Sequence, residues 1–288
     1  MHIPKQHQKA FVIGHPIAHS RSPHIHNFWI KKHGLEAEYE AFDVSPEHLG
    51  HFVDRVKGGE FVGGNVTIPY KQAIMEHCDY LSTSARAIGA VNTLHVENGR
   101  LQGSNSDHFG FSDNLDQQVP GWERSLQTAI VLGAGGAARS VIYALLERKL
   151  EHVFVLNRTA EKAKKLAAFF GEHVTGASLD EFNNFAGLAG LLVNCSAVGM
   201  GGTRFENLDL DEMPKSALVN DIVYTPLETP LLSMASKYGL RTVDGLGMLL
   251  HQAIPGFEKW FDIRPEVTPE LRSMLERTVM FPGLANRA

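Results

Sequence analysis

The chain has few of the residues that mark exported or nucleic-acid-binding proteins. Only two of its 288 residues are cysteines, so it can build neither a disulfide framework nor a thiolate metal site, which suits a reducing compartment. Its formal net charge of -5 gives no basic field for a polyanion or an anionic membrane surface. We therefore expect a cytoplasmic location and no nucleic-acid partner.

Long apolar segments are also scarce. The first nine residues carry charges with no apolar core after them, so they predict no signal peptide. The uncharged run 183–203 is long enough to cross a bilayer, but its three asparagines and several glycines indicate a buried strand with flanking loops. No association with a membrane is expected.

Metal ligands do not form a recognisable set, although the chain has 15 histidines. Six of them lie within the first 26 residues, yet no carboxylate or cysteine stands near them in the pattern of a metal site. Surface and capping histidines are the better interpretation. The sequence predicts no metal site.

The first third of the chain predicts an α/β domain. A length of 288 residues is long for one hydrophobic core, so two domains are expected. Ser22 and Pro23 would provide the N-cap and first-turn proline of one helix, and Pro69 would open another. Asn98-Gly99 favours a tight hairpin turn. The expected strands are 10–14, 37–44, 61–67, 90–95 and 99–103, with a further helix at about 46–57.

A different sequence pattern begins at Thr128, where short apolar strands alternate with helical stretches, as in a doubly wound parallel sheet. Beyond Gly245 the chain turns helical, and we expect this tail to pack on the first domain. The predicted fold is therefore α/β, with a substrate-binding domain (1–107 plus 246–288) and a Rossmann-type domain (108–245). The strands expected in the second domain are 128–132, 153–157, 191–194, 217–221 and 241–244.

A glycine-rich turn joins the first strand and helix of that second sheet. Gly133 suits the tight turn, Gly135 lets the main chain approach a pyrophosphate at the helix N-terminus, and Ala138 allows close packing. The motif is weak alone, but its strand–turn–helix context favours dinucleotide binding over a turn chosen for packing. The residues expected at the cofactor are Gly133, Ala134, Gly135, Gly136 and Ala137.

The end of the next strand indicates which dinucleotide is bound. NAD enzymes usually place Asp or Glu there, whereas this chain has Asn157, Arg158 and Thr159. Without a carboxylate to repel it, a 2′-phosphate can be bound by Arg158, with Lys162 one helical turn further on. The alternative is that both cations are merely solvated. The sequence predicts NADP.

Small polar groups of the first domain stand at strand ends and helix starts, the edges that line clefts in α/β sheets. Ser20 and Ser22 precede a helix N-terminus, which favours an anion such as a carboxylate, unless Ser22 only caps the helix. Lys71 is predicted in the first turn of a helix, where the dipole disfavours a cation. It is therefore either exposed or held for proton transfer. Asp107 is predicted to begin a helix at the domain junction, where it could cap that helix or pair with Lys71.

Nine short segments carry these features in order along the chain: 14–27, 64–71, 89–93, 103–107, 133–139, 157–159, 194–200, 221–226 and 247–252. Together they resemble the motifs of the shikimate dehydrogenases, within the shikimate/quinate dehydrogenase family. The resemblance covers nearly the whole chain. Its departures are mild, because Ser106 stands where threonine is usual and Cys195-Ser196 where Ala-Thr is common.

The resemblance implies reversible, NADPH-dependent reduction of 3-dehydroshikimate to shikimate, by hydride transfer at C3, in aromatic amino acid biosynthesis. It implies Lys71 and Asp107 as the catalytic pair, and Gly247 and Met248 beside the nicotinamide. We expect Lys71 to donate the proton and Asp107 to orient its ammonium group, while the choice of which residue holds the mobile proton stays open between the two. The substrate-binding residues that it implies are Ser20 and Ser22 for the carboxylate, with Asn65, Thr67, Asn92, Tyr224 and Gln252.

Other activities stay open. Paralogues that act on quinate or aminoshikimate share the motifs, although Arg158 argues against an NAD-preferring quinate enzyme. A non-catalytic ligand-binding paralogue is disfavoured by the presence of Lys71 and Asp107, and a folate-linked dehydrogenase lacks support from the Ser20 and Gln252 segments. Cys195 is interpreted as a packing residue, since no histidine is placed to activate it. A monomer or homodimer is expected.

Overall fold

The computed structural model describes residues 7–280, with only the main chain described at Ser125. The described chain divides into two compact units. The first contains the residues up to Ser106 together with Gln252–Leu275, and the second contains Asp107–His251 and the residues from Glu276. The predicted domain boundaries stay a prediction. Residues 1–6, on which most of the signal-peptide expectation rests, and residues 281–288 lie outside the described residues.

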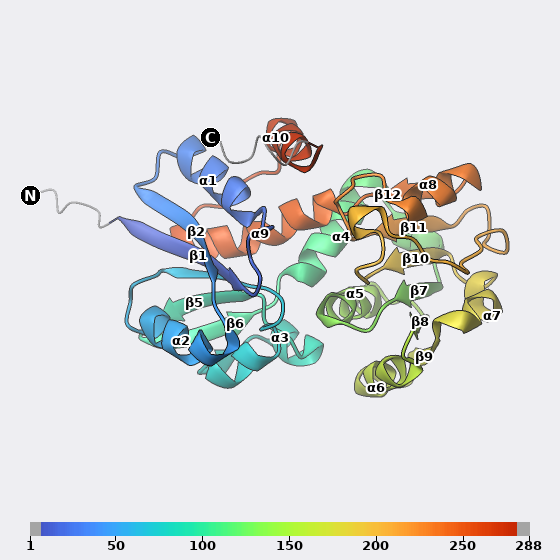
Figure 1. The fold of residues 1–288 in the computed structure, drawn as a ribbon, viewed down its shortest axis with the longest axis horizontal. Helices are drawn as coiled ribbons and strands as arrows, with labels where there is room; N and C mark the ends of the chain where they lie inside the picture. Colours follow the sequence, from blue (N-terminus) through green and yellow to red (C-terminus); the bar gives the residue numbers. More distant parts are fainter. Residues whose placement is uncertain (1–6, 281–288) are drawn as a thin grey trace, which may run out of the picture. The chain divides into compact units, whose positions relative to one another are not determined.

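A mixed six-stranded sheet forms the first unit, in the order β2-β1-β3-β5-β6-β4 (Figure 1). β1 is parallel to β2 and β3, while β5 is antiparallel to both β3 and β6. The predicted hairpin turn is confirmed, because Asn98 and Gly99 both have positive φ angles, of 52° and 72°. The strands are Gln8–Gly14 (β1), Ala37–Asp43 (β2), Gly63–Val66 (β3), Tyr80–Leu81 (β4), Thr93–Glu97 (β5) and Arg100–Ser104 (β6).

Helices cover this sheet with apolar faces set by the sequence. In α2 the buried residues Leu49, Phe52, Val53 and Val56 recur at helical spacing and pack into one cluster with Phe11. The helices of this part are α1 (Ser22–Lys32), α2 (Leu49–Lys57) and α3 (Thr83–Ile88), with 3₁₀ turns η1 (Pro46–His48) and η2 (Ala73–His77).

The tail of the chain returns to this first sheet, as the sequence predicts. The indole Nε1 of Trp260, in α9 (Leu246–Phe261), donates to the Leu94 carbonyl oxygen at 2.9 Å. A Cβ at Gly63 would lie 2.3 Å from that Nε1, so the absent side chain makes room for the indole. Trp29 Nε1 likewise donates to the carbonyl oxygen of Glu266, before α10 (Pro269–Met280), at 3.0 Å.

The second unit is a parallel six-stranded sheet in the order β12-β11-β10-β7-β8-β9. Its paired strands all run parallel, which confirms the doubly wound prediction. Its strands are Thr128–Leu132 (β7), His152–Asn157 (β8), Val174–Ser178 (β9), Leu191–Asn194 (β10), Leu218–Asp221 (β11) and Arg241–Val243 (β12).

Helices pack on both faces of this sheet. One apolar cluster joins Val141 of α5 and Leu166 of α6, and another joins Phe182 of α7 and Leu231 of α8. Within the described residues, no helix has both the length and the apolar stretch needed to cross a bilayer. The helices are α4 (Asp107–Gln118), α5 (Gly136–Glu147), α6 (Ala160–Phe170), α7 (Phe182–Ala186) and α8 (Pro230–Lys237), with 3₁₀ turns η3 (Trp122–Ser125), η4 (Leu179–Glu181) and η5 (Met200–Gly202).

Candidate active site

The glycine-rich turn leaves the N-terminus of α5 open. Gly133 has a φ of 105°, and a Cβ there would lie 3.1 Å from the main chain of Cys195 and Ser196. Gly135 is the N-cap of α5 and makes no side-chain capping hydrogen bond, and a Cβ there would meet nothing within 4 Å. Amide groups at such a helix start carry partial positive charge, so the turn fits a pyrophosphate. Ala134, Gly136 and Ala137 are half-buried around it.

The end of β8 carries cations at its surface. Arg158 and Lys162 are exposed, and the Asn157 amide donates to the Thr159 carbonyl oxygen at 3.0 Å, which folds the strand end over the start of α6. The first acidic residue of α6, Glu161, pairs with Lys164 at 3.1 Å. This strand end therefore fits a phosphate group.

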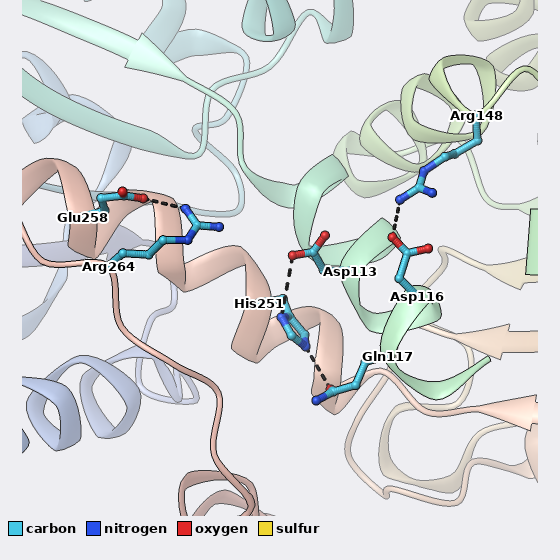
Figure 2. A network of polar contacts seen from close by, with 7 residues as sticks. All are labelled: Asp113, Asp116, Gln117, Arg148, His251, Glu258 and Arg264. Atoms are coloured by element: carbon cyan, nitrogen blue, oxygen red, sulfur yellow. Dashed lines mark hydrogen bonds and ion pairs between the residues drawn. The ribbon is translucent and has the colours of Figure 1, made fainter. Parts of the chain in front are cut away.

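The start of α9 packs closely against α4. Gly247 is buried, and a Cβ there would lie 1.8 Å from Asn114 Oδ1. Met248 is 8% exposed and belongs to the apolar cluster under α5. His251 lies one turn later, with Nε2 3.0 Å from Gln117 Oε1 and Nδ1 3.9 Å from the Asp113 carboxylate (Figure 2). Burial lowers the pKa of His251.

A buried polar network of the first unit centres on Asn92. Its Nδ2 donates to Ser106 Oγ at 3.0 Å and to Gln252 Oε1 at 3.4 Å, while its Oδ1 accepts from the Ser106 amide at 2.9 Å. Ser106 Oγ in turn donates to the Gln252 carbonyl oxygen at 2.8 Å. Asn65 Nδ2 donates to the Asn92 carbonyl oxygen at 3.1 Å. Three of the predicted substrate residues, Asn65, Asn92 and Gln252, therefore lie in one network.

The prediction that Ser22 caps α1 is wrong. Ser22 is the first residue of α1, after an N-cap at Arg21 that makes no side-chain capping bond. Instead, the Ser22 amide donates to Ser20 Oγ at 3.3 Å. Ser22 is buried, with 7% of its surface exposed. Ser20 and Ser22 therefore do lie together at a helix start.

The prediction of a helix opened by Pro69 is also wrong. The chain turns at Thr67, whose carbonyl oxygen accepts from Tyr70 N at 2.8 Å. The Lys71 carbonyl oxygen accepts from Val91 N at 2.7 Å, so this oxygen bonds the segment before β5 rather than a helix. The first helical residue is Ala73 of η2. Lys71 is therefore not in the first turn of a helix, where the dipole would disfavour its charge. Lys71 and Thr67 are half-buried.

Asp107 is the first residue of α4, as predicted, and is 6% exposed. Tyr224 is half-buried in the second unit and lies in the loop between β11 and α8, which the Asp221 side chain holds. The Asp221 carboxylate accepts from Val223 N at 3.0 Å, Asn194 Nδ2 at 2.8 Å and Thr229 Oγ1 at 2.6 Å. Burial raises the pKa of Asp221 to about 6.

Sequence reasoning did not detect Tyr39, Thr93 or Asp221 as parts of these networks. Thr93 Oγ1 donates to Asn92 Oδ1 at 2.8 Å, and its place directly after Asn92 was the available signal. Asp221 stands at the end of β11, and that strand-end position was its available signal. Burial raises the pKa of the Cys195 thiol, in keeping with a packing role. In residues 7–280, no group of three or more histidine, cysteine or acidic side chains is arranged to hold a metal.

Two family models match the chain. The shikimate dehydrogenase substrate binding domain matches residues 12–94, and the model described as shikimate / quinate 5-dehydrogenase matches residues 116–222. A relative named shikimate dehydrogenase (NADP(+)) from Brucella abortus (strain S19) is 53% identical over 268 residues, which cover 92% of each chain.

Solved structures show the same similarity. The shikimate 5-dehydrogenase of Thermus thermophilus, in complex with NADP(H) and shikimate, has a TM-score of 0.84 and 38% identity, covering 94% of this chain and 99% of that one. The quinate dehydrogenase of Corynebacterium glutamicum, in complex with NAD, has a TM-score of 0.85 and 29% identity, covering 93% and 98%. The chain therefore belongs to the shikimate dehydrogenase family.

Proposed function

We propose that this protein catalyses the reversible, NADPH-dependent reduction of 3-dehydroshikimate to shikimate, in aromatic amino acid biosynthesis. The observation that carries the proposal is the 53% identity, over 92% of both chains, to a relative named shikimate dehydrogenase (NADP(+)). The buried network around Asn92 supports it, because a polyhydroxylated ring acid needs several fixed hydrogen-bonding groups. The protein is proposed to be cytoplasmic and to be a monomer or a homodimer.

NADP fits the second unit. The open N-terminus of α5 would hold the pyrophosphate through the turn at Gly133 and Gly135, and Arg158 with Lys162 would hold the 2′-phosphate. When bound, NADPH would supply the hydride for C3 of the substrate. The other residues proposed to line the cofactor are Ala134, Gly136, Ala137, Asn157, Thr159, Gly247 and Met248.

Substrate would be bound mainly by the polar groups of the first unit. Ser20 and Ser22, at the start of α1, are proposed to bind the carboxylate, which the N-terminal end of the helix favours. The side chains proposed for the ring hydroxyls and the rest of the site are Asn65, Thr67, Asn92, Tyr224 and Gln252. Because Asn65 and Asn92 are held by hydrogen bonds within the protein, their side chains need little further ordering to bind a substrate.

Lys71 and Asp107 are proposed as the catalytic pair. The Lys71 ammonium would donate a proton to the substrate oxygen that gains charge during reduction, and its positive charge would stabilise that oxygen. The buried Asp107 carboxylate would orient the ammonium. In shikimate oxidation the same groups would accept the proton.

We expect Lys71→Ala to lower the turnover number about 10²–10⁴-fold, because a positioned proton donor contributes about that much. The dissociation constant for NADP⁺ should hardly change. The matched control is Lys57→Ala, which removes a surface lysine that pairs with Asp79 at 3.2 Å. Steady-state absorbance assays and NADP⁺ titrations measure both quantities. A Lys71→Ala enzyme with wild-type turnover would rule out this assignment.

Quinate oxidation is the second candidate function, favoured by the similarity to the quinate dehydrogenase of Corynebacterium glutamicum. That structure contains NAD, whereas the end of β8 here presents Arg158 and Lys162 to solvent. A 2′-phosphate, which NAD lacks, would give these cations a partner. The phosphate-bearing cofactor and shikimate are therefore the preferred pair.

A further inference from the structure

Tyr39 contacts one of the proposed substrate-binding side chains in the interior of the first unit. It lies in β2, and only 2% of its surface is exposed. Its hydroxyl donates to Asn65 Oδ1 at 2.6 Å. One buried phenol therefore holds the asparagine proposed for a ring hydroxyl.

The directions of these hydrogen bonds follow from the chemistry of the groups. Asn65 Nδ2 faces two oxygens, the Asn92 carbonyl at 3.1 Å and Thr93 Oγ1 at 3.4 Å, so the amide nitrogen is on that side. Asn65 Oδ1 then faces Tyr39 and can only accept. The Tyr39 hydroxyl therefore donates its one proton to Asn65. Together with the bonds at Nδ2, this bond fixes the orientation of the Asn65 amide.

The ring of Tyr39 is held just as firmly as its hydroxyl. It stacks on the His26 imidazole, with centroids 4.1 Å apart and an interplanar angle of 18°. His26 in turn lies nearly parallel to Phe257 of α9, with centroids 6.0 Å apart. The main chain is fixed as well, because Asn27 Nδ2 donates to the Tyr39 carbonyl oxygen at 2.9 Å and Asn27 Oδ1 accepts from Tyr39 N at 3.0 Å.

Two residues of α1 hold Tyr39. His26 contacts its ring, and Asn27 bonds its main chain. Tyr39 is therefore fixed to α1 through its ring and main chain, while its hydroxyl is bonded to Asn65 of β3. Any shift of α1 relative to β3 would stretch the bond between the phenol and Asn65.

We propose that Tyr39 is a positioning residue for substrate, which fixes the orientation of the Asn65 side chain so that it engages shikimate. The proposal rests on the proposed function. Tyr39 acts through Asn65, and it takes no part in proton transfer or in cofactor binding.

Tyr39→Phe tests the proposal, because it keeps the ring stack and removes only the hydroxyl. The loss leaves Asn65 Oδ1 without its donor, and one such change is worth about tenfold in binding. We expect the KM and the dissociation constant for shikimate to rise about tenfold, while kcat and the dissociation constant for NADP⁺ change less than about twofold. The matched control is Tyr238→Phe, which removes a phenol bonded to Asp209 at 2.9 Å in the second unit.

Each outcome decides the question. Weaker shikimate binding with intact NADP⁺ binding supports the positioning role. Unchanged shikimate binding overturns it, and so does an equal weakening for both ligands together with a lower melting temperature, since a purely structural role predicts that result. If the wild-type protein neither binds nor oxidises shikimate, the proposed function fails first, independently of the variant.

Discussion

His26 is a fully buried imidazole in the middle of an aromatic stack. Neither of its ring nitrogens has a hydrogen-bond partner within the described residues. Burial lowers the pKa of His26 from 6.5 to about 3, because the charged form would lose its hydration. The ring is therefore neutral at physiological pH and acts as a flat apolar plate between Tyr39 and Phe257.

This burial predicts a pH dependence of stability. Because the folded pKa is lower than the unfolded one, the contribution of His26 is complete above pH 6.5 and is lost as the pH falls towards 3. His26→Phe keeps the stack and removes the titration. We expect the drop in urea midpoint between pH 7 and pH 5 to be smaller in this variant than in the wild type. An identical drop in both proteins would contradict the pKa assigned to His26.

The candidate residues could be named from the sequence by residue type and motif, but their local structure could not always be predicted. For Ser22 and Lys71, neither the cap nor the helix assigned to them forms. Arg21 occupies the N-cap position before Ser22, and Val91 N donates to the Lys71 carbonyl oxygen, a tertiary contact that no local pattern reveals. Tyr39 itself escaped notice because its partners lie on other elements of the fold.

At the scale of elements, the seam between α4 and α9 fixes the start of α9. Asn114 Nδ2 donates to the Asp244 carbonyl oxygen at 2.9 Å, just before α9 begins, and Gly247 gives the Asn114 side chain its room. Figure 2 shows His251 of α9 between Asp113 and Gln117 of α4. The seam therefore holds the residue directly before Gln252.

Gly247→Ala should loosen this seam. Its Cβ would lie 1.8 Å from Asn114 Oδ1, and such overpacking typically costs about 1–3 kcal/mol of unfolding free energy. The matched control is Gly50→Ala in α2, where a Cβ would meet nothing within 4 Å. There, better helix propensity should stabilise the protein by about 0.5–1 kcal/mol. Urea unfolding measures both. A Gly247→Ala protein as stable as the wild type would contradict the close packing inferred between Gly247 and Asn114.

Strands with continuous apolar runs were predicted well, and strands with weak patterns were not. β10 is buried throughout and β7 is buried at every residue after Thr128, and both were expected at the same residues. β9 was missed because this edge strand, Val-Thr-Gly-Ala-Ser, has only two buried side chains. Its Gly176 packs against the main chain of Ala163 in α6, since a Cβ there would lie 2.3 Å from the Ala163 carbonyl carbon. That contact comes from tertiary packing rather than from strand periodicity.

At the scale of the whole molecule, the proposed cofactor groups belong to the second unit and most proposed substrate groups to the first. Under the proposed function, the exposed Arg158 and Lys162 at the end of β8 would select the cofactor. The network of Asn65, Asn92 and Gln252 would select the substrate. Both choices can be measured together on the wild-type protein.

The most direct measurement is kcat/KM of the full chain for shikimate and for quinate, each with NADP⁺ and with NAD⁺. We predict that shikimate with NADP⁺ gives the highest value, and that replacing NADP⁺ by NAD⁺ lowers it at least about tenfold, because Arg158 loses a charge-assisted bond to phosphate. A highest value with quinate or with NAD⁺, or no reduction of cofactor with shikimate, would contradict the proposed function.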